Sequence, residues 1–134
     1  MNANLIKGGI SFIGAYLLLL FGDFNTAFKV LLALMIMDYI TGILKAINKK
    51  ELDSRIGVIG ITKKVMIICI VAVANMIDII IKANGLNIDY VRDLTIMFYA
   101  VNEVISILEN AGEFIEIPDF IKKVLAQLNG KGDK

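Results

Sequence analysis

Apolar residues dominate four long stretches of this chain, and short polar segments separate the stretches. They cover residues 5–22, 27–47, 64–82 and 92–112. A helix needs about 20 mainly apolar residues to cross a bilayer, so each stretch is a candidate membrane span. The pattern predicts an all-α integral membrane protein with three to four transmembrane helices, forming a single membrane domain over residues 1–134.

Turn-forming and charged residues mark the breaks between these stretches. Gly22 and Asp23 follow the first stretch, and Asn84 and Gly85 follow the third. Such residues favour tight polar turns. Residues 48–63 are polar and basic, with two glycines, and predict a loop between the second and third spans.

A shorter amphipathic segment is predicted over residues 117–129. Its apolar residues recur at helical spacing, and charged residues fill the opposite face. It is too short to span a bilayer, so it suits either the membrane surface or a partner helix.

Composition supports lipid as the main solvent and excludes several function classes. The chain is 57% hydrophobic and 20% charged, with a net charge of +1 and no histidine. Without histidine, most hydrolase and zinc chemistry is excluded. The low net charge argues against nucleic acid as a partner. We therefore predict a protein that is not an enzyme and that uses no cofactor or metal.

Cys69, the single cysteine, is interpreted as a small buried apolar residue.

Basic residues are distributed unequally about the predicted spans. If all four stretches span, the N-terminus, the loop over residues 45–64 and the C-terminal tail share one side, which holds most of the basic residues; Lys29, Lys82 and Arg92 lie on the other. The positive-inside rule then places both termini in the cytoplasm.

Polar residues in the second and third stretches lie at membrane depth. Asp38, Thr41, Gly42 and Lys45 share one helix face. They either pack helices together or face water, because an isolated carboxylate in a bilayer is costly. Asp78 and Arg92, which begins the fourth stretch, should lie at the same depth, which predicts an Asp78–Arg92 ion pair within one chain or between chains.

The fourth stretch has one apolar face and one polar face. Several copies with their polar faces turned inward could line a water-filled hole; before assembly, the face should hide against Asp38, Thr41 and Lys45. A helix lying on the membrane surface is the alternative. The residues of this polar face are Arg92, Thr95, Tyr99, Asn102, Glu103, Ser106, Asn110 and Glu113.

An ordered series of motifs connects these polar positions. Asp-x-x-Thr-Gly-x-x-Lys begins at Asp38, and Phe-Tyr-x-x-Asn-Glu-x-x-Ser-x-x-Glu-Asn begins at Phe98. Over about residues 35–128 the series resembles the toxin-secretion and phage-lysis holins.

The resemblance implies a non-enzymatic protein that accumulates in the bacterial cytoplasmic membrane and oligomerises into holes. Such holes release an endolysin, or in some relatives a toxin, as cargo that is not stably bound. Predicted hole-lining or assembly residues are Asp38, Thr41, Gly42, Asn102, Glu103, Ser106 and Asn110. Predicted anchors against anionic lipid at the cytoplasmic face are Lys45, Lys49, Lys50, Lys63 and Lys64.

Two other functions fit the same residues. A small ion channel or transporter would also place carboxylates inside the membrane. An antiholin-like regulatory subunit would use them only to pair with a partner.

Overall fold

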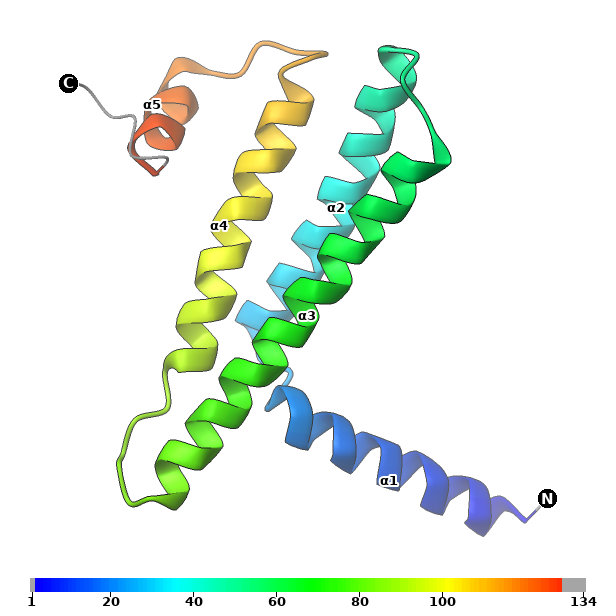
Figure 1. Ribbon diagram of the computed structural model, residues 1–134, viewed down its shortest axis with the longest axis vertical. Coiled ribbons are helices and arrows are strands. Elements are labelled where there is room, and N and C mark those ends of the chain that lie inside the picture. Colours follow the sequence, from blue (N-terminus) through cyan, green and yellow to red (C-terminus); the bar gives the residue numbers. More distant parts are fainter. Residues whose placement is uncertain (1, 129–134) are drawn as a thin grey trace.

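Every regular element in the described part of the chain, residues 2–128, is a helix. The computed structural model contains α1 (Ala3–Phe21), α2 (Thr26–Asn48), α3 (Ser54–Ala83), α4 (Val91–Ala111) and α5 (Asp119–Leu128) (Figure 1). Of these, α1, α2 and α3 are long and apolar enough to cross a membrane. The predicted all-α class with at least three membrane helices is confirmed.

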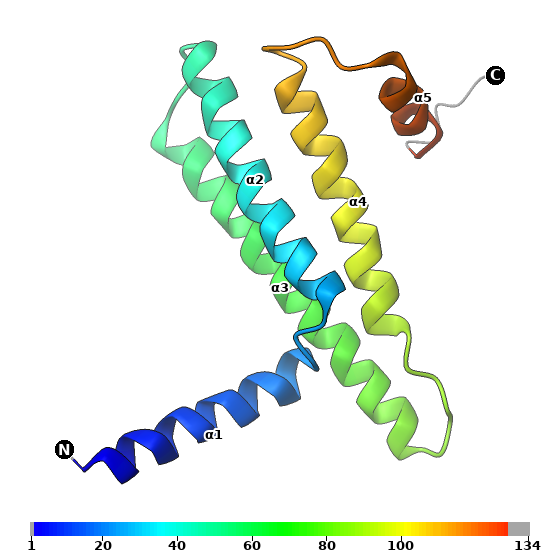
Figure 2. The same ribbon diagram turned by 180° about the vertical axis from the view of Figure 1, so that it is seen from behind.

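Helices α2, α3 and α4 form a bundle in which α3 runs antiparallel to the other two (Figures 1 and 2). The most extensive packing joins α2 to α4. The buried core consists of apolar side chains from all three helices. These are Phe28, Leu31 and Met35 of α2, Val71 of α3 and Ile96 of α4.

Helix α3 begins well before the predicted third span, and much of the predicted loop is helical. Asp53 caps this helix, because its Oδ1 accepts a hydrogen bond from the backbone N–H of Arg55 at 3.3 Å. The glycines at positions 57 and 60, which suggested a loop, instead accommodate a neighbouring helix. A Cβ atom at Gly60 would lie 3.2 Å from the ring of Tyr39 in α2. The loop is therefore shorter than predicted because these glycines serve helix packing.

Helix α1 projects away from the bundle, and none of its residues is buried (Figures 1 and 2). Only its C-terminal end is held, where the side-chain amide of Asn75 donates to the carbonyl oxygens of Leu19 and Leu20 at 2.9 and 3.2 Å. The chain turns at Gly22, whose φ of +69° is a conformation that favours glycine. A shared side for both termini stays a prediction.

Replacing Gly22 with alanine should destabilise this turn more than the same change at Gly85. Both glycines have positive φ, but a Cβ at Gly22 would lie 2.7 Å from Oδ1 of Asn75, whereas nothing lies within 4 Å at Gly85. Each change adds roughly 1–3 kcal/mol of backbone strain, and Gly22→Ala adds the steric clash. Thermal unfolding of the two variants in detergent checks this; equal losses of stability would contradict the packing role of Gly22.

Helix α5 forms within the predicted amphipathic segment, of which residue 129 lies outside the described residues. In Figures 1 and 2 it is seen nearly end-on, while α2, α3 and α4 are seen from the side, so α5 lies across the long axis of the bundle.

Candidate functional site: a buried charge cluster between three helices

One lysine holds two carboxylates in the middle of the bundle. The ammonium group of Lys64 on α3 donates to Oδ2 of Asp38 on α2 and to Oε2 of Glu103 on α4. The side chains are largely shielded, with exposed fractions of 14%, 16% and 8% respectively. We call these three residues the central charge cluster. Each of the three helices contributes one member, so the cluster links the whole bundle.

Asn110 extends the cluster toward the end of α4. Its Nδ2 donates to Oγ1 of Thr41 at 3.1 Å and to Oδ1 of Asp38 at 3.3 Å. Gly42 lies beside this amide, and a Cβ there would be in ordinary contact with Nδ2 at 3.7 Å. Glu103 and Asn110 of the predicted polar face therefore lie against α2, whereas Asn102 of that face is exposed.

A cavity of about 460 Å³ lies beside the cluster. Its walls combine polar groups with apolar side chains from α3. The polar lining residues are Asp38, Tyr39, Lys63, Lys64, Glu103, Ser106 and Asn110.

The cluster lies far from both ends of the bundle. Glu103 is about 18 Å along α4 from Val91, at 1.5 Å per residue, and α4 is about 31 Å long. Two carboxylates share one ammonium, so the cluster has a formal charge of −1. Burying such charges is favourable only while the partners stay together. Removing Lys64 would therefore leave uncompensated charges inside the bundle and destabilise it.

A second ion-pair group joins the same helices at one end of the bundle. Oε1 of Glu113 lies 3.0 Å from Nζ of Lys49 and 3.6 Å from Nζ of Lys45. The hydrogen bond from Lys49 is the main cause of a lowered pKa for Glu113, and the charge of Lys45 adds to it. Glu113 is therefore anionic at neutral pH and ties the end of α4 to α2.

The predicted Asp78–Arg92 ion pair takes a different form. The Asp78 carboxylate accepts hydrogen bonds from the backbone N–H groups of Val91 at 3.1 Å and Arg92 at 2.9 Å. It thereby caps the start of α4, where unpaired N–H groups and the helix dipole favour an anion.

The guanidinium of Arg92 points instead toward the end of α1. It donates to the carbonyl oxygens of Phe21 and Asp23, both at 2.5 Å, and to Oδ1 of Asp93 at 3.0 Å. Its charge is also 5.5 Å from the ring centroid of Phe28. Within one chain the two side chains therefore form no ion pair, because backbone groups at two helix ends bind both of them; a pair between chains stays a prediction.

The predicted site residues therefore separate into several environments. Asp38, Thr41, Gly42, Glu103 and Asn110 meet at the centre, with Ser106 lining the cavity. Asn102 is exposed and borders a groove between α3 and α4. Among the predicted anchors, Lys45 and Lys49 bind Glu113, Lys50 and Lys63 are exposed, and Lys64 lies inside the bundle.

Two important residues were missed or misplaced by sequence reasoning. Lys64 was expected at the lipid surface, and Asn75 was not singled out as a contact for α1. Lys64, Val71 and Asp78 follow one another at seven-residue spacing, which places them on one helix face. That spacing is the sequence signal that distinguishes Lys64 from Lys63. Within residues 2–128 no group of acidic or cysteine side chains could hold a metal ion.

Comparison with known proteins identifies relatives along nearly the whole chain. The family model described as bacteriophage holin family matches residues 15–130. An uncharacterised protein of Clostridium perfringens is 40% identical over 96% of this chain and 93% of its own length. An uncharacterised protein of Halalkalibacterium halodurans is 36% identical, over 97% and 98%. A probable holin of Bacillus phage phi105 is 36% identical, over 86% and 82%. No solved structure matches the chain.

Proposed function

This chain belongs to the bacteriophage holin family, and from that premise we propose that it oligomerises in the bacterial cytoplasmic membrane into holes that release an endolysin or a toxin. It acts without catalysis, as one membrane domain, with both termini in the cytoplasm. Family membership and three apolar helices make it a multi-pass protein of that membrane. Assembly, cargo release and orientation are the proposed steps.

The observation that carries the proposal is the inward orientation of the polar face. Glu103 is 6% exposed, and the Asn110 amide donates to Asp38 and Thr41. Helix α4, which could line a hole, therefore packs with these polar residues against its neighbours. Assembly would separate α4 from α2 and present Glu103, Ser106 and Asn110 to water. Several copies are needed, because one α4 cannot enclose a channel.

Cells that make this chain alone test the proposal directly. We expect abrupt release of a cytoplasmic reporter enzyme of about endolysin size, and weaker or delayed release from the Glu103→Leu variant. Loss of membrane potential without enzyme release would indicate an ion channel. No permeabilisation would indicate an antiholin-like regulatory subunit. Either result would overturn the proposal.

Single cysteines test the lining separately. In a Cys69→Ala background, Ser106→Cys should react with a membrane-impermeant thiol reagent only after release begins. Val101→Cys, which lies on the apolar face of α4, is the matched control and should stay unreactive. Equal labelling of both positions would contradict the assignment of the polar face.

A further inference from the structure

The C-terminal segment carries exposed apolar side chains that no other helix of the described chain covers extensively. Phe120 and Val124 of α5 are 69% and 51% exposed, and Phe114 and Ile115 before the helix are 51% and 64% exposed. These residues follow α4 and lie outside the bundle of α2, α3 and α4, so packing within that bundle does not cover them. We call these four residues the C-terminal apolar surface.

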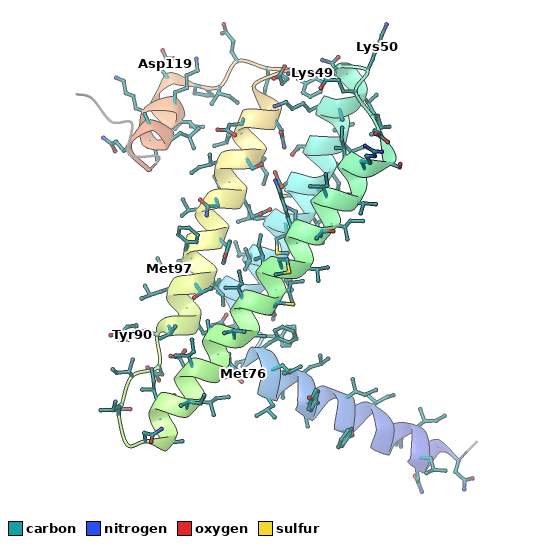
Figure 3. The ribbon with its side chains drawn as sticks, viewed as in Figure 1. Lys49, Lys50, Met76, Tyr90, Met97 and Asp119 are labelled. Carbon is teal, nitrogen blue, oxygen red and sulfur yellow. The ribbon has the colours of Figure 1, made fainter. Side chains whose placement is uncertain are left out.

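The position of this surface identifies what covers it. Helix α5 starts shortly after α4 ends, and it lies across the bundle axis. Figure 3 shows Asp119 at the same end of the bundle as Lys49 and Lys50, while Tyr90 lies toward the opposite end. A helix that lies crosswise where membrane-spanning helices end is parallel to the bilayer surface. The C-terminal apolar surface then continues the lipid-facing surface of the bundle.

Charge points to the same environment. Lys122 and Lys123 are exposed on α5 beside the apolar residues, and Lys50 adds an exposed basic side chain at that end. Amphipathic helices with this arrangement bury their apolar face at the boundary between headgroups and acyl chains, and their lysines attract anionic lipid. The salt bridges of Glu113 to Lys45 and Lys49 hold the start of the linker at this level.

We propose that residues 114–127 bind the membrane surface at this end of the bundle. Phe120 and Val124 enter the acyl region, and Lys122 and Lys123 contact anionic headgroups. The proposal depends on membrane insertion of the bundle but not on hole formation. The sequence allowed either the membrane surface or a partner helix for this segment, and the proposal selects the membrane surface.

A single tryptophan tests the proposal, because the chain contains none. The full chain with Phe120→Trp is reconstituted in vesicles that contain anionic lipid with brominated acyl chains. Asp119→Trp, an exposed position on the polar face of α5, is the matched control. We expect blue-shifted emission and loss of most fluorescence for Phe120→Trp, and little quenching for Asp119→Trp. Quenching of Phe120→Trp should weaken in purely zwitterionic vesicles.

Two outcomes would overturn the proposal. Solvent-like, unquenched emission from Phe120→Trp would show that the surface does not enter the bilayer. Blue-shifted emission without bromine quenching would show that protein, such as a second copy, covers it. Neither outcome bears on reporter release from cells, so failure here is distinguishable from failure of the proposed hole formation.

Discussion

Replacing Lys64 with methionine should destabilise the packed chain by about 3–5 kcal/mol, the usual cost of breaking a buried ion pair. The variant would leave Asp38 and Glu103 facing each other inside the bundle with no cation. Since these carboxylates come from α2 and α4, their repulsion would separate the two helices that pack most extensively. Thermal unfolding in detergent and hydrogen exchange of the α4 amides would measure the loss.

Lys63→Met is the matched control for this experiment. It removes one positive charge from the adjacent position, but Lys63 is exposed and has no salt bridge within the described residues. Adding Asp38→Asn and Glu103→Gln to Lys64→Met should recover most of the lost stability, because no uncompensated charge remains buried. Equal melting temperatures for Lys64→Met and Lys63→Met would contradict the central role of Lys64.

Replacing Arg92 with leucine should release the end of α1 from the bundle. The variant loses charged hydrogen bonds to the carbonyl oxygens of Phe21 and Asp23, each typically contributing about 1.5–3 kcal/mol. The remaining link from Asn75 reaches only Leu19 and Leu20. Hydrogen exchange at the amides of Gly22 and the last turn of α1 should become faster.

Arg92→Lys separates the effect of charge from that of geometry. Lysine keeps the positive charge near the C-terminal end of α1 but lacks the planar fork that reaches two carbonyl oxygens. We expect it to lie between the parent and Arg92→Leu in amide protection. Unchanged protection in Arg92→Leu would show that Asn75 alone holds α1.

The sequence predicted the helices well because lipid imposes a simple pattern on them. Helices α1, α2 and α4 nearly coincide with the predicted stretches. The start of α3 was predicted too late, since Gly57 and Gly60 indicate a break by local rules but here accommodate Tyr39. Local composition alone does not distinguish a turn glycine from one at a helix contact.

The site was predictable in its members but not in its pairing. The spacing of polar residues along each helix predicted that Asp38 lies near Asn110. This contact depends only on which helix faces meet. The spacing did not place Lys64, because a lysine at the end of an apolar run has two favourable positions, the headgroup region and a buried carboxylate pair. Spacing brought Asp78 to Arg92 but missed the form of the contact, because Asp78 binds backbone N–H groups and the Arg92 guanidinium binds mainly carbonyl oxygens, which no residue pattern displays.

The length of α3 connects the bundle to the thickness of the membrane. Its 30 residues extend about 45 Å, whereas the hydrocarbon core of a bilayer is about 30 Å thick. The mainly apolar part of α3, residues 65–81, is only about 26 Å long, so α3 stands upright in a thick bilayer and tilts in a thinner one. Because Asp78 near the end of α3 caps α4, a change in tilt acts on α4 as well. The thickness of the bilayer, which lipid composition sets, thereby affects the orientation of α4, the helix that carries the polar face.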